Sequence, residues 1–544
     1  MTVSEAVAIF SKIDPDDILK ESGAFFQLPV LPEYLTSEMF TASCYRALGY
    51  AGMRDNWVMQ NGAELTCLFT KGKEEGVASG AFSRDEVWKL LKDILLSPED
   101  PKQRRSQKYP NYLFLAPIVP ATAYFSNPIR LKKNANTVGG NPWNVELLFK
   151  ALVAYCAKDK DDADALWHEF FTALSVSEDS NEDYFARIIE KVLEDCADAV
   201  KAKKPDLSLQ FPGWKIRDNS IFSDGKFLIG KCNRRSFDGM SPLGEIRDSI
   251  RLILRQKGKF SRWQWMAMLD AQMRLSVVAL VLWLLDLHHV ANVAITEYVI
   301  NGKEIPDGDA IEFFRSFYEK HHLTKVFPYG EGFAKAERKV VEQYARDYLR
   351  LAFILSLTKE LPQSASEAID WSSIPCFVDS LRKLQRLYSS SGNKNLFTEG
   401  FARMLEERVE DVNPRKSRLR HILEFFAVLR QRSVVASQSD FSRYDQSYWV
   451  RKKGNYYSAP FIVDIGSVAC FTIVFCCARG KRVFPLKDLR LYLSKFYVSV
   501  KDDAHTDKFL LYLKGLGLTM DSPDAEDGLM VQNPFYSEEE NEAR

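Results

Sequence analysis

Residues 461–520 of this chain read FIVDIGSVAC FTIVFCCARG KRVFPLKDLR LYLSKFYVSV KDDAHTDKFL LYLKGLGLTM. The apolar run from Phe461 to Ala478 is followed by Gly480, and glycine is the usual residue just beyond the end of a helix. Pro485 suits the first position of the next helix, where its missing N–H has no partner to lose. These signals predict a first helix, a short strand at 481–484 and a second helix.

A third helix and a hairpin are predicted to follow. Apolar residues at three- and four-residue spacing mark the faces of the second and third helices; they are Leu486, Leu489, Leu493 and Phe496, then Phe509, Leu510, Leu513 and Leu516. Asp503 or Thr506 can cap the third helix, and Gly515 and Gly517 stop it. Beyond it, alternating apolar residues at 518–520 and 529–531 flank a turn and predict a hairpin. This order of elements is that of a winged helix, predicted at 454–535 and followed by an acidic tail at 536–544.

The charge of this winged helix leaves its binding partner open. In helix-turn-helix modules the corresponding third helix enters the major groove of DNA, so Lys508 and Lys514 are candidate contacts. Acidic residues oppose phosphate binding on the same helix and in the turn of the hairpin; they are Asp502, Asp503, Asp507, Asp521, Asp524, Glu526 and Asp527. DNA binding and protein docking therefore remain two alternatives.

A second region, 413–456, is strongly basic, with ten bases and three acids. Bases combined with aromatics can hold a nucleic-acid backbone and stack on its bases. The tyrosine and tryptophan residues in or directly after this region are Tyr444, Tyr448, Trp449, Tyr456 and Tyr457. The candidate contacts here are Arg415, Lys416, Arg418, Arg420, Arg430, Arg432, Arg451, Lys452 and Lys453. The alternative is a basic face that meets an acidic neighbour. Charge reversal at 415–420 is expected to weaken binding and to leave folding intact.

Composition indicates a large folded protein with several domains. The chain has 544 residues, 46% of them hydrophobic, which excludes a disordered protein. Its 73 basic and 73 acidic residues cancel, whereas proteins that coat nucleic acid are usually basic. Nine scattered cysteines without a CxxC pair indicate a reducing, cytoplasmic location. The apolar run Leu275–Leu285 is too short for a membrane span of about 20 residues, so no membrane contact is expected.

The fold class that we expect is mostly α-helical and multidomain, with the winged helix at the C-terminus. An N-terminal α+β or helical domain is predicted at 1–135, and an acidic helical region at 140–205. Within it, residues 158–206 hold 14 acids and 7 bases, which we interpret as a solvated helical face. A central helical domain is predicted at 206–435.

No catalytic motif is recognisable in the sequence. There is no phosphate-binding loop, no dinucleotide-binding glycine motif, no HExxH zinc helix and no GxSxG nucleophile elbow. His288 and His289 lack further ligands at helical spacing and are better explained as core or boundary residues. We therefore expect no enzymatic activity, no cofactor and no bound metal.

Residues 260–275 read FSRWQWMAMLDAQMRL, a stretch that is expected to be buried. This segment, followed by a C-terminal winged helix, resembles the large accessory proteins of bacterial multi-gene antiviral systems of the Druantia type. The resemblance implies a role in antiviral defence beside other subunits, among them a separate helicase-like ATPase. Two hypotheses follow: a non-catalytic subunit that contacts DNA or RNA, and an assembly protein whose winged helix docks a partner subunit.

Overall fold

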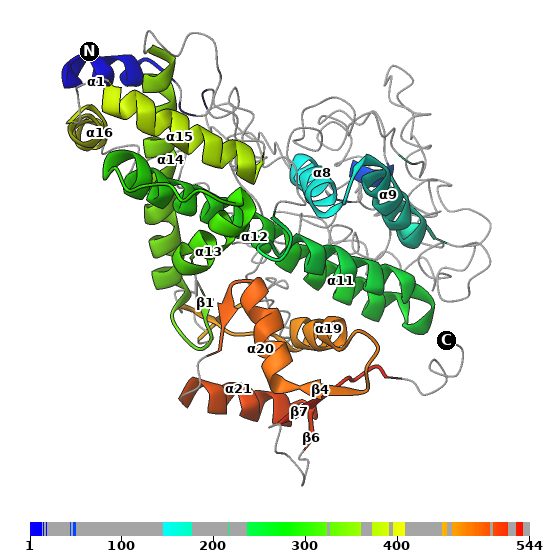
Figure 1. Ribbon diagram of the computed structural model, residues 1–544. Helices are drawn as coiled ribbons and strands as arrows, with labels where there is room; N and C mark the ends of the chain where they lie inside the picture. The colour runs from blue at the N-terminus through cyan, green and yellow to red at the C-terminus, as the bar shows by residue number, and fades with distance from the viewer. Residues whose placement is uncertain are drawn as a thin grey trace, which may run out of the picture.

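The computed structural model describes about half of the chain, and most of that part is helical (Figure 1). The described residues are 1–13, 15, 18, 44, 47–49, 145–176, 216, 237–323, 327–360, 373–390, 395–408, 449–453, 460–500, 504–520 and 529–536. The mostly helical fold class is confirmed. Buried apolar residues form one continuous core that includes Phe10 near the start of the chain and Val531 near its end.

The helices of this part, in chain order, are α1 (Val3–Ser11), α8 (Val145–Cys156), α9 (Lys160–Leu174), α11 (Leu243–Arg255), the 3-10 turn η7 (Lys257–Lys259), α12 (Arg262–Ala294), the π-helical segment η8 (Ile295–Ile300), α13 (Ala310–His321), α14 (Phe333–Glu360), α15 (Ile374–Ser390), α16 (Asn395–Glu407), α19 (Ser467–Ala478), α20 (Leu486–Lys495) and α21 (Ala504–Gly515). The strands are β1 (Phe327–Pro328), β2 (Val450–Lys452), β3 (Phe461–Val463), β4 (Val483–Pro485), β5 (Val498–Ser499), β6 (Thr519–Met520) and β7 (Met530–Gln532).

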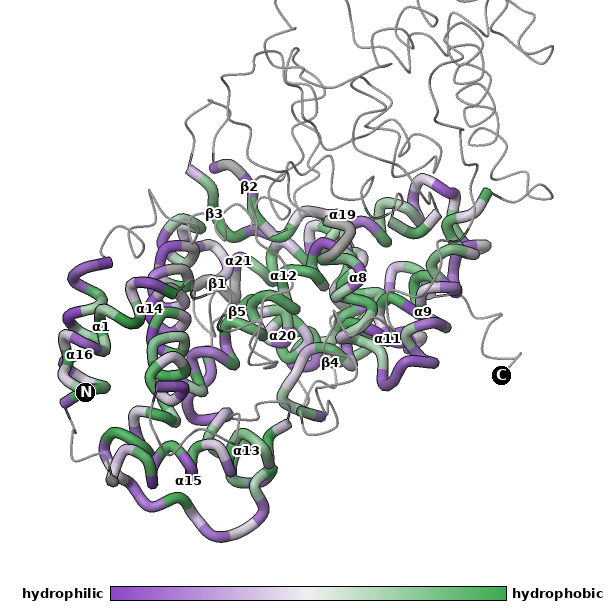
Figure 2. The backbone as a smooth tube through the Cα atoms, turned by 90° about the horizontal axis from the view of Figure 1, so that it is seen from above, coloured by the Kyte–Doolittle hydropathy of each residue, from purple (hydrophilic) through white to green (hydrophobic). Residues whose placement is uncertain are grey.

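The central helix α12 organises the fold. Its first turn is fixed by a capping box, in which Ser261 and Gln264 satisfy each other's backbone N–H groups. Apolar residues lie on all its faces, so α12 packs on every side, against α8, α11, α14 and α19 among others (Figure 2). The helix runs unbroken through the apolar run at 275–285. With η8 it is long and apolar enough to cross a membrane, yet 89% of its apolar window is buried within the protein.

The N-terminal helix α1 packs against helices that lie far from it in the sequence. It begins with a capping box between Thr2 and Glu5, and it lies against α16 and α14. Its Phe10 ring meets Phe353 of α14, and the guanidinium of Arg408 lies over the same ring. Of the predicted domain 1–135, helix α1 therefore joins the core formed by 333–408.

The C-terminal elements form a compact unit below α11 and α12 in Figure 1. Strand β4 pairs with β7, and β7 pairs with β6, all antiparallel, so the sheet order is β4-β7-β6. Helices α19, α20 and α21 accompany this sheet, and the hairpin predicted at 518–531 is confirmed as β6 and β7. Parallel pairing of β5 with β1 attaches the unit to the segment before α14.

Two details at the start of this unit differ from the sequence-based expectation. The apolar run 461–478 is not one helix: Phe461–Val463 is a strand paired with β2, and the helix begins at Ser467. A short apolar run fits either structure, so periodicity could not separate them. Pro485 ends β4 and precedes the helix, which starts at Leu486.

Candidate nucleic-acid and partner interface

The most basic part of the C-terminal unit is the segment 479–495, which we call the basic segment. It contains six bases and a single acid, Asp488; the bases are Arg479, Lys481, Arg482, Lys487, Arg490 and Lys495. The segment forms the turn after α19, strand β4 and helix α20. The side chains of Lys481, Arg482 and Lys487 are exposed.

The turn that presents Lys481 and Arg482 is held rigidly by its backbone. Arg479 and Gly480 both have positive φ angles, 48° and 86°, so the chain reverses sharply at the end of α19. Asn533, directly after β7, donates its side-chain amide to the carbonyl of Lys481 at 3.2 Å and its backbone N–H to that of Arg482 at 2.9 Å. Both basic side chains therefore project from a fixed turn.

Helix α20 separates an apolar face from a basic face. Its buried residues are Leu486, Leu489, Tyr492 and Leu493. The Tyr492 hydroxyl lies 2.8 Å from that of Ser249, which ties the buried face to α11. Lys487 and Lys495 lie on the outer face beside Leu491, whose side chain is 62% exposed. The same helix thus offers both charge and an aliphatic side chain to a partner.

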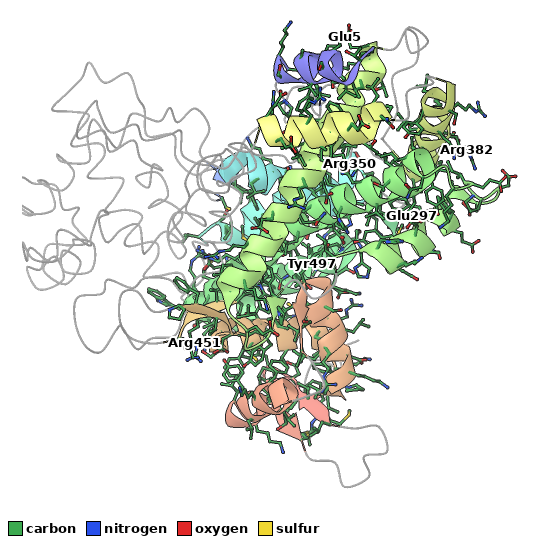
Figure 3. The ribbon with its side chains drawn as sticks, turned by 90° about the vertical axis from the view of Figure 1, so that its left-hand side faces the viewer. Glu5, Glu297, Arg350, Arg382, Arg451 and Tyr497 are labelled. Atoms are coloured by element: carbon green, nitrogen blue, oxygen red, sulfur yellow. The ribbon has the colours of Figure 1, made fainter. Side chains whose placement is uncertain are left out.

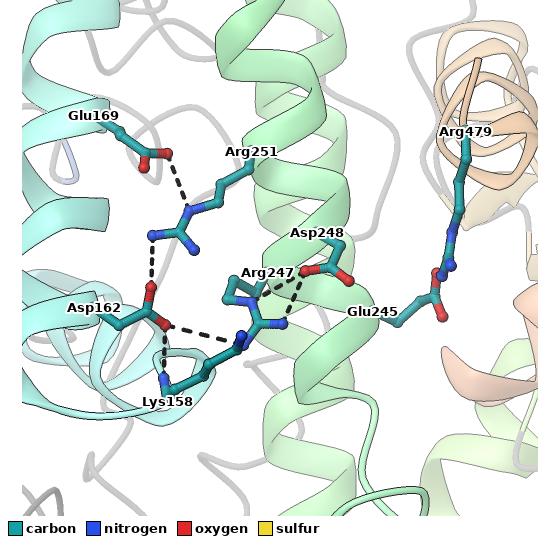
Figure 4. A network of polar contacts seen from close by, with 8 residues as sticks. All are labelled: Lys158, Asp162, Glu169, Glu245, Arg247, Asp248, Arg251 and Arg479. Carbon is teal, nitrogen blue, oxygen red and sulfur yellow. Dashed lines mark hydrogen bonds and ion pairs between the residues drawn. The ribbon is translucent and has the colours of Figure 1, made fainter.

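Glu245 of α11 neutralises part of the basic segment. Its carboxylate is buried and accepts bonds from Arg479 and from Lys495, the latter at 2.8 Å. Burial alone would raise the pKa of Glu245, but the two cations outweigh burial and lower it. Figure 4 shows Arg479 reaching Glu245, while Arg247 and Arg251 on the same helix bind acids of α9 and α11. Arg479 and Lys495 therefore hold α11 and the C-terminal unit together.

Lys508 and Lys514, two of the candidate contacts, lie exposed on α21. Leu511 lies between them and is 67% exposed, whereas Phe509 and Leu513 point into the core. Figure 3 shows α21 at the end of the molecule away from α1. The outer face of this helix therefore combines two bases with an exposed leucine.

Arg451 is committed to an ion pair within the protein. Its guanidinium binds Asp464, with Nε at 2.7 Å, and Asp464 also accepts from the Tyr329 hydroxyl at 3.2 Å. The Tyr329 ring packs edge-on against Phe509 at 5.1 Å, so these contacts connect β2 to α21. Burial and the neighbouring Asp464 raise the pKa of Tyr329. This pairing stabilises the fold and leaves Arg451 less suited to binding phosphate.

The other candidates of the 413–456 region are only partly accounted for. Lys452 lies in β2 opposite Phe461, and Lys453 is exposed, with its N–H bonded to the Pro460 carbonyl at 2.9 Å. Six candidates lie outside the described residues: Arg415, Lys416, Arg418, Arg420, Arg430 and Arg432. The structure thus brings 451–453 and α21 into one unit.

The basic segment 479–495 is not among the candidate contacts predicted from the sequence, although its net charge of +5 over 17 residues was a readable signal.

The histidines of α12 are occupied by structural contacts. His288 is fully buried, its Nδ1 lies 2.9 Å from the Leu284 carbonyl, and burial lowers its pKa to about 4. The neighbouring His289 pairs with Asp347 of α14 at 3.1 Å. Within the described ranges, no three His, Cys, Asp or Glu side chains gather closely enough to hold a metal ion. The expected absence of catalysis and of cofactors stays a prediction.

Comparisons of the chain with known protein families, with curated proteins and with solved structures find no match. The geometry of the described residues therefore carries the functional argument.

Proposed function

We propose that this protein is a non-catalytic subunit that contacts nucleic acid through a C-terminal winged helix. Support comes from the chain order α19, β4, α20, α21, β6, β7 and from the sheet order β4-β7-β6, both of which suit that module. In this reading α20 and α21 form the helix-turn-helix and the β6–β7 hairpin is the wing. Helix α21 is then the one that approaches the groove.

The observation that carries the proposal is the basic segment. Lys481, Arg482 and Lys487 are exposed, and Lys508 and Lys514 add two exposed bases on α21. Phosphate contacts by lysine and arginine supply most of the sequence-independent affinity for nucleic acid. The neutral charge of the whole chain does not oppose this, because a localised basic surface is sufficient for such binding.

The second candidate function is docking of a partner subunit by the same module. It is favoured by Leu491 and Leu511, whose exposed aliphatic side chains are better suited to a protein surface than to phosphates. The acids predicted in the wing turn at 521–528 also favour it. Both functions fit a subunit of a larger assembly. Membership of an antiviral system with a helicase-like ATPase rests on the sequence resemblance alone and stays a prediction.

The test is the salt dependence of nucleic-acid binding by the full chain. Fluorescence anisotropy with labelled duplex and single strands compares the wild type with a K481E/R482E/K487E variant. Each lost phosphate contact is expected to lower the slope of log affinity against log salt by about 0.9 on duplex DNA. When salt is raised from 50 to 200 mM, the affinity of the wild type should therefore fall about 40-fold more than the affinity of a variant that has lost three contacts.

A matched control reverses three exposed bases elsewhere, K12E/K320E/K335E, with the same change in net charge. This control is expected to keep most of the wild-type slope. Equal slopes for both variants, or no retention of any nucleic acid by the wild type, would favour the docking alternative. In that case the basic triple variant should instead lose a partner subunit in pull-down.

A further inference from the structure

Trp263, in the first turn of α12, is an exposed aromatic residue in an otherwise polar environment. Its side chain is 55% exposed, whereas Trp265 and Trp283 of the same helix are buried. The exposed positions beside it on α12 are Ser261, Gln264 and Ala267, all of them small or polar. Because the capping box fixes the first turn of the helix, the indole ring projects from a rigid backbone.

Two bases that precede Trp263, Lys257 and Arg262, connect the start of α12 to the end of α9. The Lys257 ammonium donates to the Ser175 carbonyl at 2.8 Å, and the Arg262 guanidinium donates to the Leu174 carbonyl at 2.8 Å. Both carbonyls lie at the end of α9, where cations are favoured by the helix dipole. Two further bases, Arg255 and Lys259, are exposed at the end of α11 and in η7.

The surface formed by Trp263, Arg255 and Lys259 is connected to the basic segment through residues 533–535. The Phe260 ring, three residues before Trp263, packs edge-on against Phe535 at 4.9 Å. Two residues earlier, Asn533 binds the carbonyls of Lys481 and Arg482. Figure 1 shows the chain after β7 running toward the far end of α11. The start of α12 and the basic turn therefore both contact the segment 533–535.

We propose that this surface binds single-stranded nucleic acid, with one unpaired base stacked on Trp263 and the adjoining phosphates near Lys259 and the basic turn. The proposal rests on the proposed function and specifies its ligand. In a duplex both faces of each base are covered by neighbours, so only an unstacked base can lie on an exposed indole ring. Arg255 and Lys259 supply the positive charge that a backbone beside that base requires.

A single strand fits this surface better than a protein partner does. Tryptophan hot spots in protein interfaces lie at the centre of packed, largely apolar patches. Among the described residues, the other exposed large hydrophobic side chains are Met1 and residues of α20, α21 and β6, and none of them lies on α11, η7 or α12. Within 255–263 the exposed charged residues, Arg255 and Lys259, are both basic, which matches phosphate.

The experiment measures binding of labelled oligothymidylate, oligouridylate and a duplex of equal length to the full chain by fluorescence anisotropy. Replacing a stacking aromatic by alanine typically weakens binding about 5- to 150-fold, and we expect a loss in this range for Trp263→Ala on single strands. Duplex affinity should change less than about twofold. Trp263→Phe should retain most of the affinity because it keeps a ring, and Lys259→Glu should reduce the salt slope on single strands by about 0.7.

Ser316→Ala is the control, because it removes an exposed polar group from α13, outside the proposed interface. It should leave single-strand affinity unchanged. Single-strand binding by Trp263→Ala at wild-type strength would overturn the inference, and the proposed function would stand if K481E/R482E/K487E still lost affinity. Equal losses of duplex and single-strand binding together with a lowered melting temperature would assign Trp263 a purely structural role. Failure of the wild type to bind either form would overturn both proposals.

Discussion

Replacing Glu245 by glutamine is expected to loosen the C-terminal unit from α11. The buried carboxylate holds Arg479 and Lys495, and glutamine keeps the shape while losing the charge. Removing one partner of a buried ion pair costs about 3–5 kcal/mol, whereas exposed pairs contribute about 0.2–1 kcal/mol. The two cations are 57% and 43% exposed, and solvent screens their side of the interaction. We therefore expect a loss of about 1–2 kcal/mol.

The assay is amide hydrogen exchange on the full chain, because a large protein has no single free energy of unfolding. A loss of about 1–2 kcal/mol makes local opening about 5- to 30-fold more frequent, so amides of α19 and α20 should exchange faster by that factor. Asp248→Asn, an exposed neighbour on the same helix, should change exchange little, since surface substitutions stay within about 0.5 kcal/mol.

The pH dependence of the stability that Glu245 contributes is a second test of this contact. The pKa of Glu245 is lowered in the folded protein, so its contribution to stability is present above the ordinary value of 4.5 and is lost as the pH falls through the lowered pKa. As the pH falls through the lowered pKa of Glu245, the difference in amide exchange rates between the wild type and Glu245→Gln should therefore shrink. Unchanged exchange in α19 and α20 at neutral pH would refute the anchoring role of Glu245.

Three further predictions concern the core, the basic turn and the absence of chemistry. Asp286 accepts bonds from the hydroxyls of Tyr318 at 2.5 Å and Tyr497 at 3.2 Å, so Asp286→Asn should destabilise this part of the core by about 1–3 kcal/mol, measured as faster amide hydrogen exchange in α12 and α13. Burial raises the pKa of Asp286 above 3.8, so the wild-type advantage should be larger near pH 4 and decline as the pH rises through the raised pKa. Gly480→Ala should cost about 1–2 kcal/mol because its φ is 86°, a backbone conformation that alanine disfavours. Gly258→Ala should cost less, because Gly258 has no positive φ and the added Cβ meets open space at both positions. The pure protein should neither turn over ATP nor contain stoichiometric zinc, as colorimetric and elemental assays would show.

The sequence alone determined the elements whose signals are local. The Ser261–Gln264 capping box that starts α12 is one such signal, because its two residues lie within a single turn of the chain. The apolar spacing of 486–496 and the alternation at 518–520 and 529–531 likewise predicted α20 and the hairpin. These features require no knowledge of distant contacts.

Only the tertiary structure decided which charged and aromatic residues are available to a partner. Arg451 and Lys453 are equivalent in a charge count, yet Arg451 is held by Asp464, directly after the neighbouring strand β3. Glu245 engages Arg479 from more than 230 positions away, and Trp263 is exposed while Trp265 is buried two residues later. Burial and ion pairing depend on which distant segments meet, and a local pattern contains no information on that choice because contacts between distant segments form only when the whole core assembles.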